Sequence, residues 1–585
     1  MVNEEISKIF TRIACFLEME RVPFKPVAYR KAALSIRMLE EDIADIYKKG
    51  GREAIEKLPG VGESISEKII EFLKTGKVKL YERYRKKYPI DIDALVSVEG
   101  IGCKTAKRLY DCLKIRNLID LEKAARAGKI RKLIDFGAKS EKNILQSIKF
   151  AKKRKDKFLL GEILPQAEEI KKRLSVLKTV AKVDICGSLR RMKEVIGDVD
   201  ILLCLKEMPL KQRSREARKV MDVFCSLPEV SKVWEKGKTK SSVRMRQGFD
   251  VDLRIVPASS YGAALQYFTG SREHNIRLRR LAAEKGFKLN EYGLFKKIKA
   301  IAGETEEGIY RKLSLACPPP EIRENKGEIE AALQKNLPKL IELADIKGDL
   351  HCHSNWNGGE DSIEEMARTA IALGYDYLGI SDHTKFLKIE NGLDEKQLKT
   401  QAKEIESLNY KFEKQNIKFR VIHGAETNIL NNGSLDISER CLSGLDYVIA
   451  GVHSNLKMSK QKMTERIIKA MKNPYVKIIS HPTGRLLNKR AAYLLDMGKL
   501  FRAAKETKTA LEINSFPQRL DLNGGNIREA IKAGVKLAIN SDAHCRLHLS
   551  FMRYGVATAR RGWSAKENII NSWSLPKLLK FFKEQ

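Results

Sequence analysis

Three aspartates near the middle of the chain could together hold divalent cations. Asp198 and Asp200 lie in the segment VIGDVDILL, and Asp252 lies in FDVDLRIV. Because side chains alternate along a β-strand, the carboxylates of Asp198 and Asp200 should share one face while Val199 faces the core. Paired carboxylates suit Mg2+ or Mn2+, and two such ions can activate a 3′-hydroxyl and neutralise a leaving pyrophosphate. The spacing therefore predicts a two-metal site, with Asp252 contributed by a neighbouring strand.

A short motif ahead of these aspartates could bind phosphates. It is the segment GSLRR, in which Gly187 allows close backbone approach. Ser188 and Arg190 can bind β- and γ-phosphate oxygens of a nucleotide. Solvated turns also produce Asp-x-Asp pairs, and several classes of nucleotidyltransferase combine Gly-Ser with Asp-x-Asp. These residues therefore predict nucleotide chemistry without naming the substrate.

Histidines form the second group that could do chemistry. Eight of the nine lie beyond residue 350, and His274 is the exception. In chain order the group reads His351, His353, His383, His423 beside Glu426, His453, His481, Asp542 with His544, and His548. Side chains at the carboxyl ends of barrel strands converge on one mouth, where they can share metal ions. One such histidine is more often a core residue, but this regular placement favours a metal-dependent hydrolase centre.

The elements that must position these residues change along the chain. Residues 1–150 have apolar positions three and four apart, which predicts short amphipathic helices. From about residue 180, short β-type runs surround a charged helical stretch at 207–226, which predicts a mixed α/β block. Prolines within 316–332 predict a domain boundary, and the strands beyond it alternate with helices as in a parallel β/α barrel. The fold class is therefore multidomain α/β.

Two glycine turns lie in the helical part. Gly60 and Gly62 stand in LPGVG, Gly100 and Gly102 stand in VEGIG, and each pair leads into a basic helix. Backbone N–H groups at such a helix start can meet a phosphate without reading bases. A single copy would fit an ordinary helix–turn–helix connection equally well. Two copies in a basic region favour contacts with a nucleic acid backbone.

Composition limits the classes of protein to consider. The formal net charge is +36, with most of the excess before residue 318, and clustered positive charge of this kind attracts polyanions. The ten cysteines include no Cys-x-x-Cys pair, so we expect reduced thiols rather than a disulfide framework or a thiolate zinc site. The N-terminal residues lack the layout of a secretory signal. We expect a soluble protein of the cytoplasm.

The segment LPGVGESISEKIIEFLKTGK resembles the helix-hairpin-helix of the N-terminal lyase domain of family X DNA polymerases, the polymerase beta-like group. The resemblance places Lys68 at the Schiff-base lysine, which would remove a 5′-deoxyribose phosphate. Ser64 stands where polymerase beta has another lysine. The DNA-binding positions that it implies are Lys25, Tyr29, Arg30, Gly60, Gly62, Gly100 and Gly102.

The segment GSLRRMKEVIGDVDILL resembles the nucleotidyltransferase signature of the same family. The resemblance implies that Asp198, Asp200 and Asp252 are catalytic, and that Gly187, Ser188 and Arg190 bind the nucleotide. The next landmark, YFTGS, matches the segment that holds the incoming sugar and excludes ribose. It adds nucleotide contacts by Tyr267, Phe268, Gly270 and Asn275, and a template contact by Arg279.

The C-terminal histidines resemble those of the PHP domain, and ISHPTGR and LEIN are similar to the versions fused to family X polymerases. The resemblance implies two or three Zn2+ or Mn2+ ions and a 3′–5′ exonuclease or 3′-end-processing activity. The implied ligands are His351, His353, His383, Glu426, His453, His481, Asp542 and His544. His423 has no match in the ligand pattern and should be structural. Asn357 stands where the family usually has an acidic residue or histidine, and a neutral amide is a poorer ligand for a hard cation.

We therefore predict a monomeric polymerase that fills short gaps in base excision repair or end joining, with gapped or nicked DNA and deoxynucleoside triphosphates as partners. The predicted segments are a lyase-like domain (1–85), a fingers-type domain (86–155), a palm (156–260), a thumb (261–317), a linker (318–344) and a PHP domain (345–585). Two alternatives remain open. One is a non-catalytic DNA-binding repair scaffold, and the other is a small-molecule phosphatase with a DNA-targeting arm.

Overall fold

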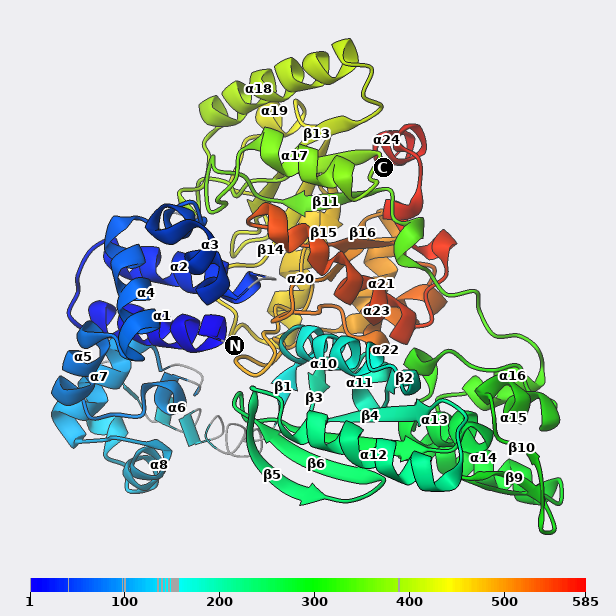
Figure 1. The fold of residues 1–585 in the computed structure, drawn as a ribbon. Coiled ribbons are helices and arrows are strands. Elements are labelled where there is room, and N and C mark those ends of the chain that lie inside the picture. The colour runs from blue at the N-terminus through cyan, green and yellow to red at the C-terminus, as the bar shows by residue number, and fades with distance from the viewer. Residues whose placement is uncertain are drawn as a thin grey trace. The chain divides into compact units, whose positions relative to one another are not determined.

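The computed structural model describes residues 2–39, 42–96, 98, 101–133, 136–137, 140–141, 144–145, 148, 157–387 and 390–584. The backbone divides into two compact units (Figure 1). One comprises residues 1–155 with 488–490, and the other comprises residues 156–487 and 491–585. Among the helices of the described ranges, none has both the length and the apolar character needed to cross a membrane.

Within the first unit, the described secondary structure of residues 2–148 is helical, as the sequence predicts. Its α-helices are α1 (Val2–Met19), α2 (Lys25–Met38), α3 (Ile43–Glu56), α4 (Glu63–Thr75), α5 (Lys79–Lys87), α6 (Ile92–Val96), α7 (Cys103–Leu113) and α8 (Leu118–Arg126). Helix α1 buries Ile6, Phe10 and Ile13, which lie three and four residues apart and form one apolar stripe. This stripe packs on α2, where the ring of Tyr29 meets Phe10 edge-on with ring centroids 5.4 Å apart.

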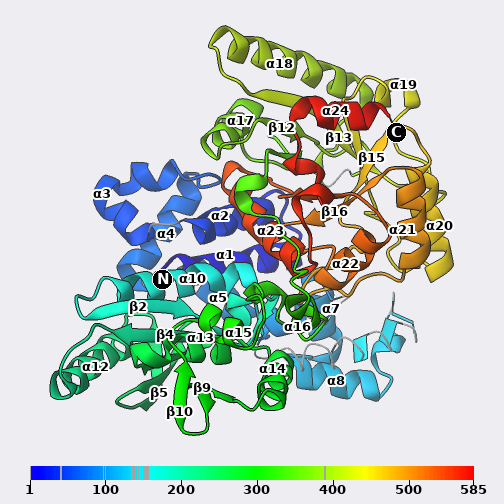
Figure 2. The same cartoon turned by 90° about the vertical axis from the view of Figure 1, so that its right-hand side faces the viewer.

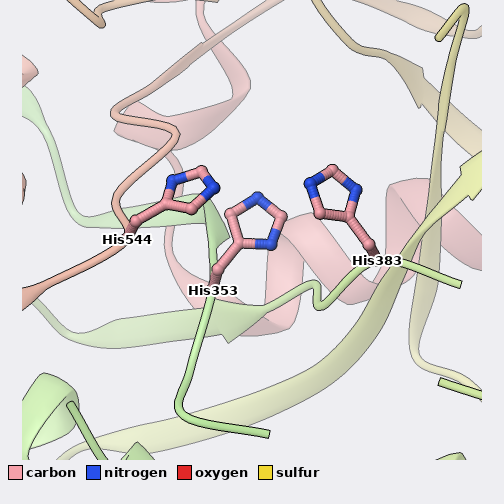
Figure 3. A group of neighbouring side chains, drawn as sticks. All are labelled: His353, His383 and His544. Atoms are coloured by element: carbon pink, nitrogen blue, oxygen red, sulfur yellow. The ribbon is translucent and has the colours of Figure 1, made fainter. Parts of the chain in front are cut away.

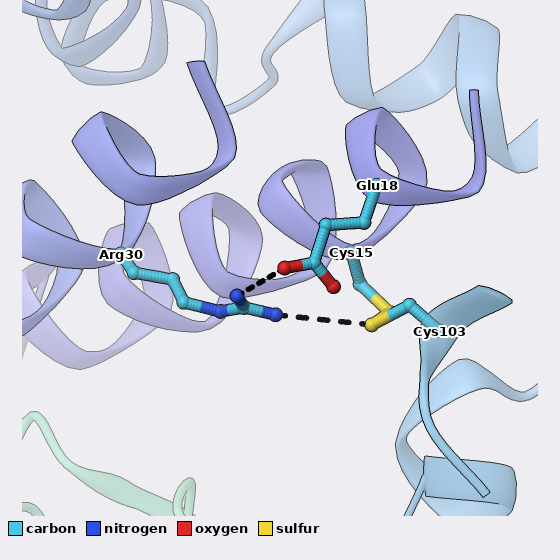
Figure 4. The surroundings of a disulfide bond; sticks show 4 residues. All are labelled: Cys15, Glu18, Arg30 and Cys103. Atoms are coloured by element: carbon cyan, nitrogen blue, oxygen red, sulfur yellow. Dashed lines mark hydrogen bonds and ion pairs between the residues drawn. A yellow bond between two sulfur atoms is a disulfide. The ribbon is translucent and has the colours of Figure 1, made fainter. Parts of the chain in front are cut away.

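A disulfide within this unit corrects the prediction that all cysteines are reduced. It joins Cys15 of α1 to Cys103 at the start of α7, with the Cα atoms 5.3 Å apart (Figure 4). The two residues are 88 positions apart in the sequence, so their spacing gave no sign of pairing. Arg30 lies beside the bond, where it forms an ion pair with Glu18, and its Nη2 is 3.9 Å from the sulfur of Cys103.

The second unit begins with a palm built on a five-stranded sheet of order β2-β4-β7-β6-β5. Its strands are β2 (Val180–Ile185), β4 (Asp198–Leu205), β5 (Val230–Lys236), β6 (Lys240–Met245) and β7 (Asp250–Val256). The short strands β1 (Phe158–Leu159) and β3 (Val195–Ile196) pair separately, and the helices are α10 (Leu160–Ser175), α11 (Gly187–Arg190) and α12 (Leu210–Cys225). Strands β4 and β7 run parallel, whereas the other pairs in the five-stranded sheet are antiparallel.

The thumb follows as two helices, a small antiparallel sheet and two further helices. These are α13 (Tyr261–Thr269), α14 (Arg272–Glu284), β8 (Lys288–Asn290), β9 (Gly293–Lys296), β10 (Lys299–Ala302), α15 (Glu306–Lys312) and α16 (Glu328–Leu333). His274 is fully buried here, 2.6 Å from Glu328 and 2.8 Å from the hydroxyl of Tyr310. Helix α16 lies in the predicted linker, yet its residues Ile329 and Ala332 belong to the thumb core.

The C-terminal part is a nearly closed barrel of seven parallel strands, as predicted. They are β11 (Gly348–Cys352), β12 (Tyr377–Ile380), β13 (Arg420–Asn428), β14 (Tyr447–Gly451), β15 (Val476–Ile479), β16 (Ala510–Asn514) and β17 (Leu537–Asn540). A single bridge between Cys352 and Ala543 brings the first and last strands together. The strands are buried almost throughout, which explains why they read as apolar runs.

Helices surround the barrel. They are α17 (Ile363–Ala372), α18 (Glu395–Lys414), α19 (Glu439–Leu442), α20 (Lys460–Met471), α21 (Met497–Glu506), α22 (Gly524–Lys532), α23 (Met552–Arg561) and α24 (Leu575–Lys583). Helices α20, α21 and α22 lie on one side of the strands (Figure 2). Their buried residues, including Ile467, Leu500 and Ile527, form one continuous core with the outer faces of the strands. The helices cover the sides of the barrel, so the polar side chains gather at the carboxyl ends of the strands.

Candidate active sites

The palm carboxylates meet on adjacent parallel strands. In the register of β4 and β7, Asp198 faces Asp250, and Asp200 faces Asp252. Val199 and Val251 are buried between these positions, so the predicted alternation is confirmed on both strands. The three predicted aspartates therefore lie together on one face of the sheet.

Repulsion and burial perturb these carboxyls. Burial, followed by the charges of Asp198 and Asp252, raises the pKa of Asp200 to about 7. Burial and then Asp252 also raise the pKa of Asp198. Lys240 lies beside Asp252, with its Nζ 3.9 Å from Oδ2, and Ser242 donates a hydrogen bond of 2.5 Å to Oδ1. The charges of Arg254 and Arg191 only partly offset the repulsion at Asp200, and such a cluster of carboxylates fits divalent cations.

Gly187 permits the backbone to pass close to these carboxylates. Its φ is +64°, and a Cβ at this position would lie 2.5 Å from Oδ2 of Asp200. The preceding Cys186 donates its backbone N–H to the carbonyl of Asp200 over 2.7 Å. A side chain at 187 would therefore strain the backbone and displace the Asp200 carboxylate.

Arg190 is already engaged by protein groups. Its Nη2 lies 2.6 Å from Oε2 of Glu306, and its Nη1 donates to Thr269 over 2.6 Å. The neighbouring Arg191 pairs with Glu324 at 3.0 Å and donates to the carbonyl of Thr269. Arg190 thus ties the motif to the thumb, and its phosphate contact remains a prediction.

The YFTGS segment ends α13 and turns at Gly270 into α14. Asn275 accepts from the side chain of Gln266 and donates to the carbonyl of Tyr267, both at 2.7 Å. These bonds fix the turn that presents the rings of Tyr267 and Phe268, whose centroids lie 5.2 Å apart. The Arg279 guanidinium is exposed, and its Nε donates to the carbonyl of Asn275 over 3.3 Å.

Sequence reasoning missed Arg254 of β7. Its guanidinium carbon lies 4.6 Å from the centroid of the Phe268 ring, and its charge opposes the raised pKa of Asp200. It lies two positions after Asp252, so strand alternation alone places it on the same face. That signal was readable from the sequence.

The histidines of the barrel lie at or just beyond the ends of the strands. His351 lies within β11, next to its last residue. His383, His453 and His481 follow the ends of β12, β14 and β15 by two or three residues. Asp542 and His544 follow the end of β17 by two and four residues, and Glu426 lies on β13. The parallel topology brings all of these side chains to one end of the barrel.

Glu426 lies between the two halves of this group. Its Oε2 is 3.2 Å from Nε2 of His351 and 2.9 Å from Nδ1 of His383. Its Oε1 is 3.3 Å from Nε2 of His453 and 3.1 Å from Nε2 of His481. A carboxylate with one oxygen toward each pair of imidazoles is arranged to bridge two ions.

Buried nitrogen atoms without partners show that the group fits metal ions. Ring nitrogens of His351, His353, His383, His453 and His481 are buried and lack hydrogen-bond partners. Such atoms are costly unless something else binds them. Three triads have ligand atoms within 4.8 Å of one another, and Figure 3 shows the one formed by His353, His383 and His544. Asp542 completes the arrangement, with Oδ1 3.3 Å from Nε2 of His353.

Residues around the ligands orient them, and most were missed from sequence. Glu512 lies 2.7 Å from Nδ1 of His351, and Asn428 lies 2.7 Å from Nδ1 of His453. These contacts hold each ring so that Nε2 points toward Glu426. Arg519 brings a positive charge, with Nε 3.4 Å from Oδ2 of Asp542. Glu512 lies in the LEIN segment, but its partner became visible only in the folded barrel.

Two histidines lie outside the ligand group. His423 is buried against Gln401, with Nε2 3.1 Å from the amide oxygen, and burial lowers its pKa to about 4. Its predicted structural role agrees with this position. His548 packs against the rings of Phe516 and Phe551, and burial lowers its pKa to about 3.

Apart from Arg279, the residues predicted to bind DNA belong to the first unit. Gly62 and Gly102 precede α4 and α7 as N-caps without a side-chain hydrogen bond, which leaves the first amides of each helix for an anion. Gly60 adopts a φ of +71° in the turn, and Gly100 lies outside the described residues. Lys25 is exposed at the start of α2.

Tyr29 and Arg30, which were also predicted to contact DNA, are buried or already paired with another residue. Tyr29 is 5% exposed, and burial raises its pKa to about 12, so it serves the core. Arg30 is held by Glu18. Lys68 is half-buried on α4, where its Nζ donates to the carbonyl of Ser64 over 2.8 Å in an exposed hydrogen bond. Its amine is accessible, as a Schiff-base lysine must be.

The paired palm carboxylates and the histidine-rich barrel define a metal-dependent enzyme of the nucleotidyltransferase class with a second metal centre. Family models match in chain order. They are a helix-hairpin-helix domain (1–78), a SAM-like helix-hairpin-helix tandem (92–149), a DNA polymerase beta palm (161–241), a DNA polymerase beta thumb (264–324) and a PHP domain (349–515).

Curated relatives agree with these matches. The chain is 36% identical over 590 residues to the DNA polymerase/3′-5′ exonuclease PolX of Bacillus subtilis (strain 168), covering 100% of both chains. It is 26% identical over 326 residues to DNA polymerase lambda of Rattus norvegicus, covering 52% of each. A probable phosphatase of Acetivibrio thermocellus is 32% identical over 213 residues, which is 34% of this chain and 78% of that protein. The chain belongs to the family X DNA polymerases that carry a C-terminal PHP domain.

Proposed function

We propose that this enzyme fills short gaps in DNA during base excision repair or end joining, and that its PHP domain removes nucleotides from 3′ ends. The observation that carries the polymerase function is the alignment of Asp198, Asp200 and Asp252 on β4 and β7. Mg2+ or Mn2+ bound there would assist loss of the 3′-hydroxyl proton and neutralise the leaving pyrophosphate. The chain itself positions the reactants.

The positioning follows from the elements around the carboxylates. Helix α11 begins at Gly187, and the Ser188 hydroxyl in its first turn would bind the triphosphate. The rings of Tyr267 and Phe268 stand at the end of α13, where a hydroxyl at the 2′ position of the incoming sugar would be crowded. Helix starts at Gly62 and Gly102 would bind the DNA backbone without regard to sequence. Deoxynucleotides and gapped or nicked DNA are the substrates that suit this combination.

Primer extension across a short gap tests the polymerase function. Asp252→Ala should abolish extension, because it removes one of three carboxylates that hold the ions. Asp222→Ala is the control, since Asp222 lies on α12 and pairs with Lys236 at 2.7 Å. Extension by the Asp252→Ala enzyme at the rate of the control would refute the assignment.

The PHP centre supports hydrolysis of the phosphodiester at a 3′ end. Its Glu426 bridge and its unpartnered imidazoles suit two or three Zn2+ or Mn2+ ions, which lower the pKa of water and stabilise the charge of the transition state. Arg519 lies beside Asp542, where it can bind the scissile phosphate. His351→Ala should abolish release of 3′ nucleotides. Comparing 3′-ended DNA with a small phosphomonoester would reveal a phosphatase instead.

Lys68 supports a third activity, removal of a 5′-deoxyribose phosphate. Its amine would attack C1′ of the sugar aldehyde and release water to form an imine, which borohydride can trap. Wild-type protein should be trapped on a DNA with an incised abasic site, and Lys68→Ala should not. Equal trapping of both proteins would refute the role of Lys68.

A further inference from the structure

The segment that follows His353, residues 354–359, contains no acidic residue. Its residue Asn357 is 6% exposed and donates from Nδ2 to the carbonyl of His383 over 2.9 Å. Its Oδ1 is buried without a hydrogen-bond partner. Asn357 therefore presents a neutral oxygen at the edge of the histidine group. A neutral oxygen contributes little to binding a dication.

A carboxylate reaches the same place from another loop. A Cβ on Gly358 would lie 2.6 Å from Oε2 of Glu390 and 3.5 Å from Cδ2 of His544. The Glu390 carboxylate therefore occupies the space that a side chain at 358 would need. The backbone holds it there, because Gly358 donates its N–H to the carbonyl of Glu390 over 3.2 Å.

The surroundings of Glu390 leave its charge available. Within the described ranges, no cation or hydrogen-bond donor pairs with its carboxylate, although it is only half-exposed. A Cβ on Gly358 would touch both Glu390 and His544, so this carboxylate and this imidazole border the same space.

The nearby imidazoles need such a charge. His353, His383 and His544 have ligand atoms within 4.8 Å of one another, and they form a triad without an acidic member (Figure 3). Neutral imidazoles alone leave the charge of a dication uncompensated. Glu426 lies 2.9 Å from Nδ1 of His383 and Asp542 lies 3.3 Å from Nε2 of His353, but both carboxylates also face the other imidazoles of the centre.

We propose that Glu390 supplies the carboxylate of a third metal position, together with His383 and His544, and so replaces an acidic residue that the segment 354–359 lacks. The inference rests on the proposed PHP function. It assigns the ligand set from this chain's own geometry, with Asn357 contributing a neutral oxygen at most. Glu390 acts from the segment that follows β12, not from the loop that carries the first two histidines.

Metal content tests the proposal without relying on activity. The full-length protein is dialysed against Mn2+, and bound ions are counted by mass spectrometry and by electron paramagnetic resonance. Glu390→Gln should hold one Mn2+ per chain fewer than wild type, or bind its weakest ion at least about tenfold less tightly. Glu406→Gln is the matched control, since this substitution removes the same charge from an exposed position on α18. It should bind as wild type does.

A second variant moves the carboxylate to the other loop. Glu390→Ala empties the space beside Gly358, so the combination Gly358→Asp with Glu390→Ala should restore the ion that Glu390→Ala loses. Mn2+ content of Glu390→Gln equal to wild type in number and affinity would overturn the proposal. So would failure of Gly358→Asp to restore binding in a folded protein. Loss of nuclease activity in His351→Ala is measured separately, so the PHP function can stand if Glu390 fails.

Discussion

Asp200 illustrates how packing changes the chemistry of a single side chain. It lies on β4 between Asp198 and the Asp252 of the next strand, with Gly187 against its carboxylate. Burial and the two neighbouring charges together raise its pKa to about 7. A bound dication relieves the repulsion, so the apo site is poised to exchange a proton for a metal ion.

The polymerase should therefore lose metal affinity as the pH falls below about 7. Below that pH Asp200 is protonated, and an incoming ion must displace the proton; above it the carboxylate is already charged. For one proton, the apparent Mg2+ affinity should fall about tenfold per pH unit below 7. The Mg2+ concentration that gives half-maximal extension, compared one pH unit below and above 7, measures this. An equal half-maximal Mg2+ concentration below and above pH 7 would contradict this prediction.

At the scale of the residue, the sequence predicted where the site residues lie better than it predicted which side chains contact them. Asp198, Asp200 and the barrel histidines were found because alternation and strand ends fix where a side chain points. Glu512, Arg519 and Glu390 were missed, because each acts on a ligand that is distant in the sequence. Only the packing of strands and loops shows those contacts.

At the scale of elements, one buried carboxylate joins the palm to the thumb. Glu306, at the start of α15, pairs with Arg190 of α11 and with the fully buried Arg323. Burial raises the pKa of Glu306, but the two guanidinium groups outweigh it and lower the pKa to about 2. This network fixes α11 against the helices that carry the YFTGS segment.

Glu306→Gln should destabilise the protein, because it leaves the charge of Arg323 buried without compensation. Removing one partner of a buried ion pair typically costs about 3–5 kcal/mol. Glu307→Gln removes the same charge from the adjacent, exposed residue and should change little. Urea unfolding monitored by tryptophan fluorescence compares the two. If both variants unfold at the same urea concentration, the ion-pair network does not stabilise the fold.

The disulfide of the helical unit makes a second prediction at this scale. Joining two residues 88 positions apart restricts the unfolded chain and should stabilise the unit by about 4 kcal/mol. Cys15→Ser should therefore lower the unfolding temperature of this unit under oxidising conditions. With a reductant present, wild type and variant should unfold alike. A wild-type unfolding temperature that does not respond to the reductant would show that the bond does not form.

Most elements were predictable, because hydrophobic periodicity reports helices and strands directly. The helical first unit, the α12 stretch and the parallel barrel all followed from it. The Cys15–Cys103 pairing did not, since no spacing rule relates distant cysteines in a helical fold. Helix α16 was assigned to a linker because prolines precede it, yet Ile329 and Ala332 make it part of the thumb core.

At the scale of the whole molecule, the palm and the barrel share one compact unit. Arg485 binds both carboxylate oxygens of Glu194, at 3.0 and 2.9 Å. Arg485 lies four residues after the barrel histidine His481, and Glu194 lies four residues before Asp198. The sequence separated these domains but gave no sign of this contact. The two metal centres are nonetheless built from separate residues, so each chemistry should be removable alone.

The central claim is that one chain carries two independent phosphoryl-transfer centres. A gapped DNA whose primer ends in a mismatched nucleotide tests it, with products resolved by length. Wild type should shorten the primer and then extend it across the gap. Asp252→Ala should only shorten it, and His351→Ala should leave the mismatch uncut while still extending a matched primer. Extension by Asp252→Ala, or shortening by His351→Ala, would contradict the account.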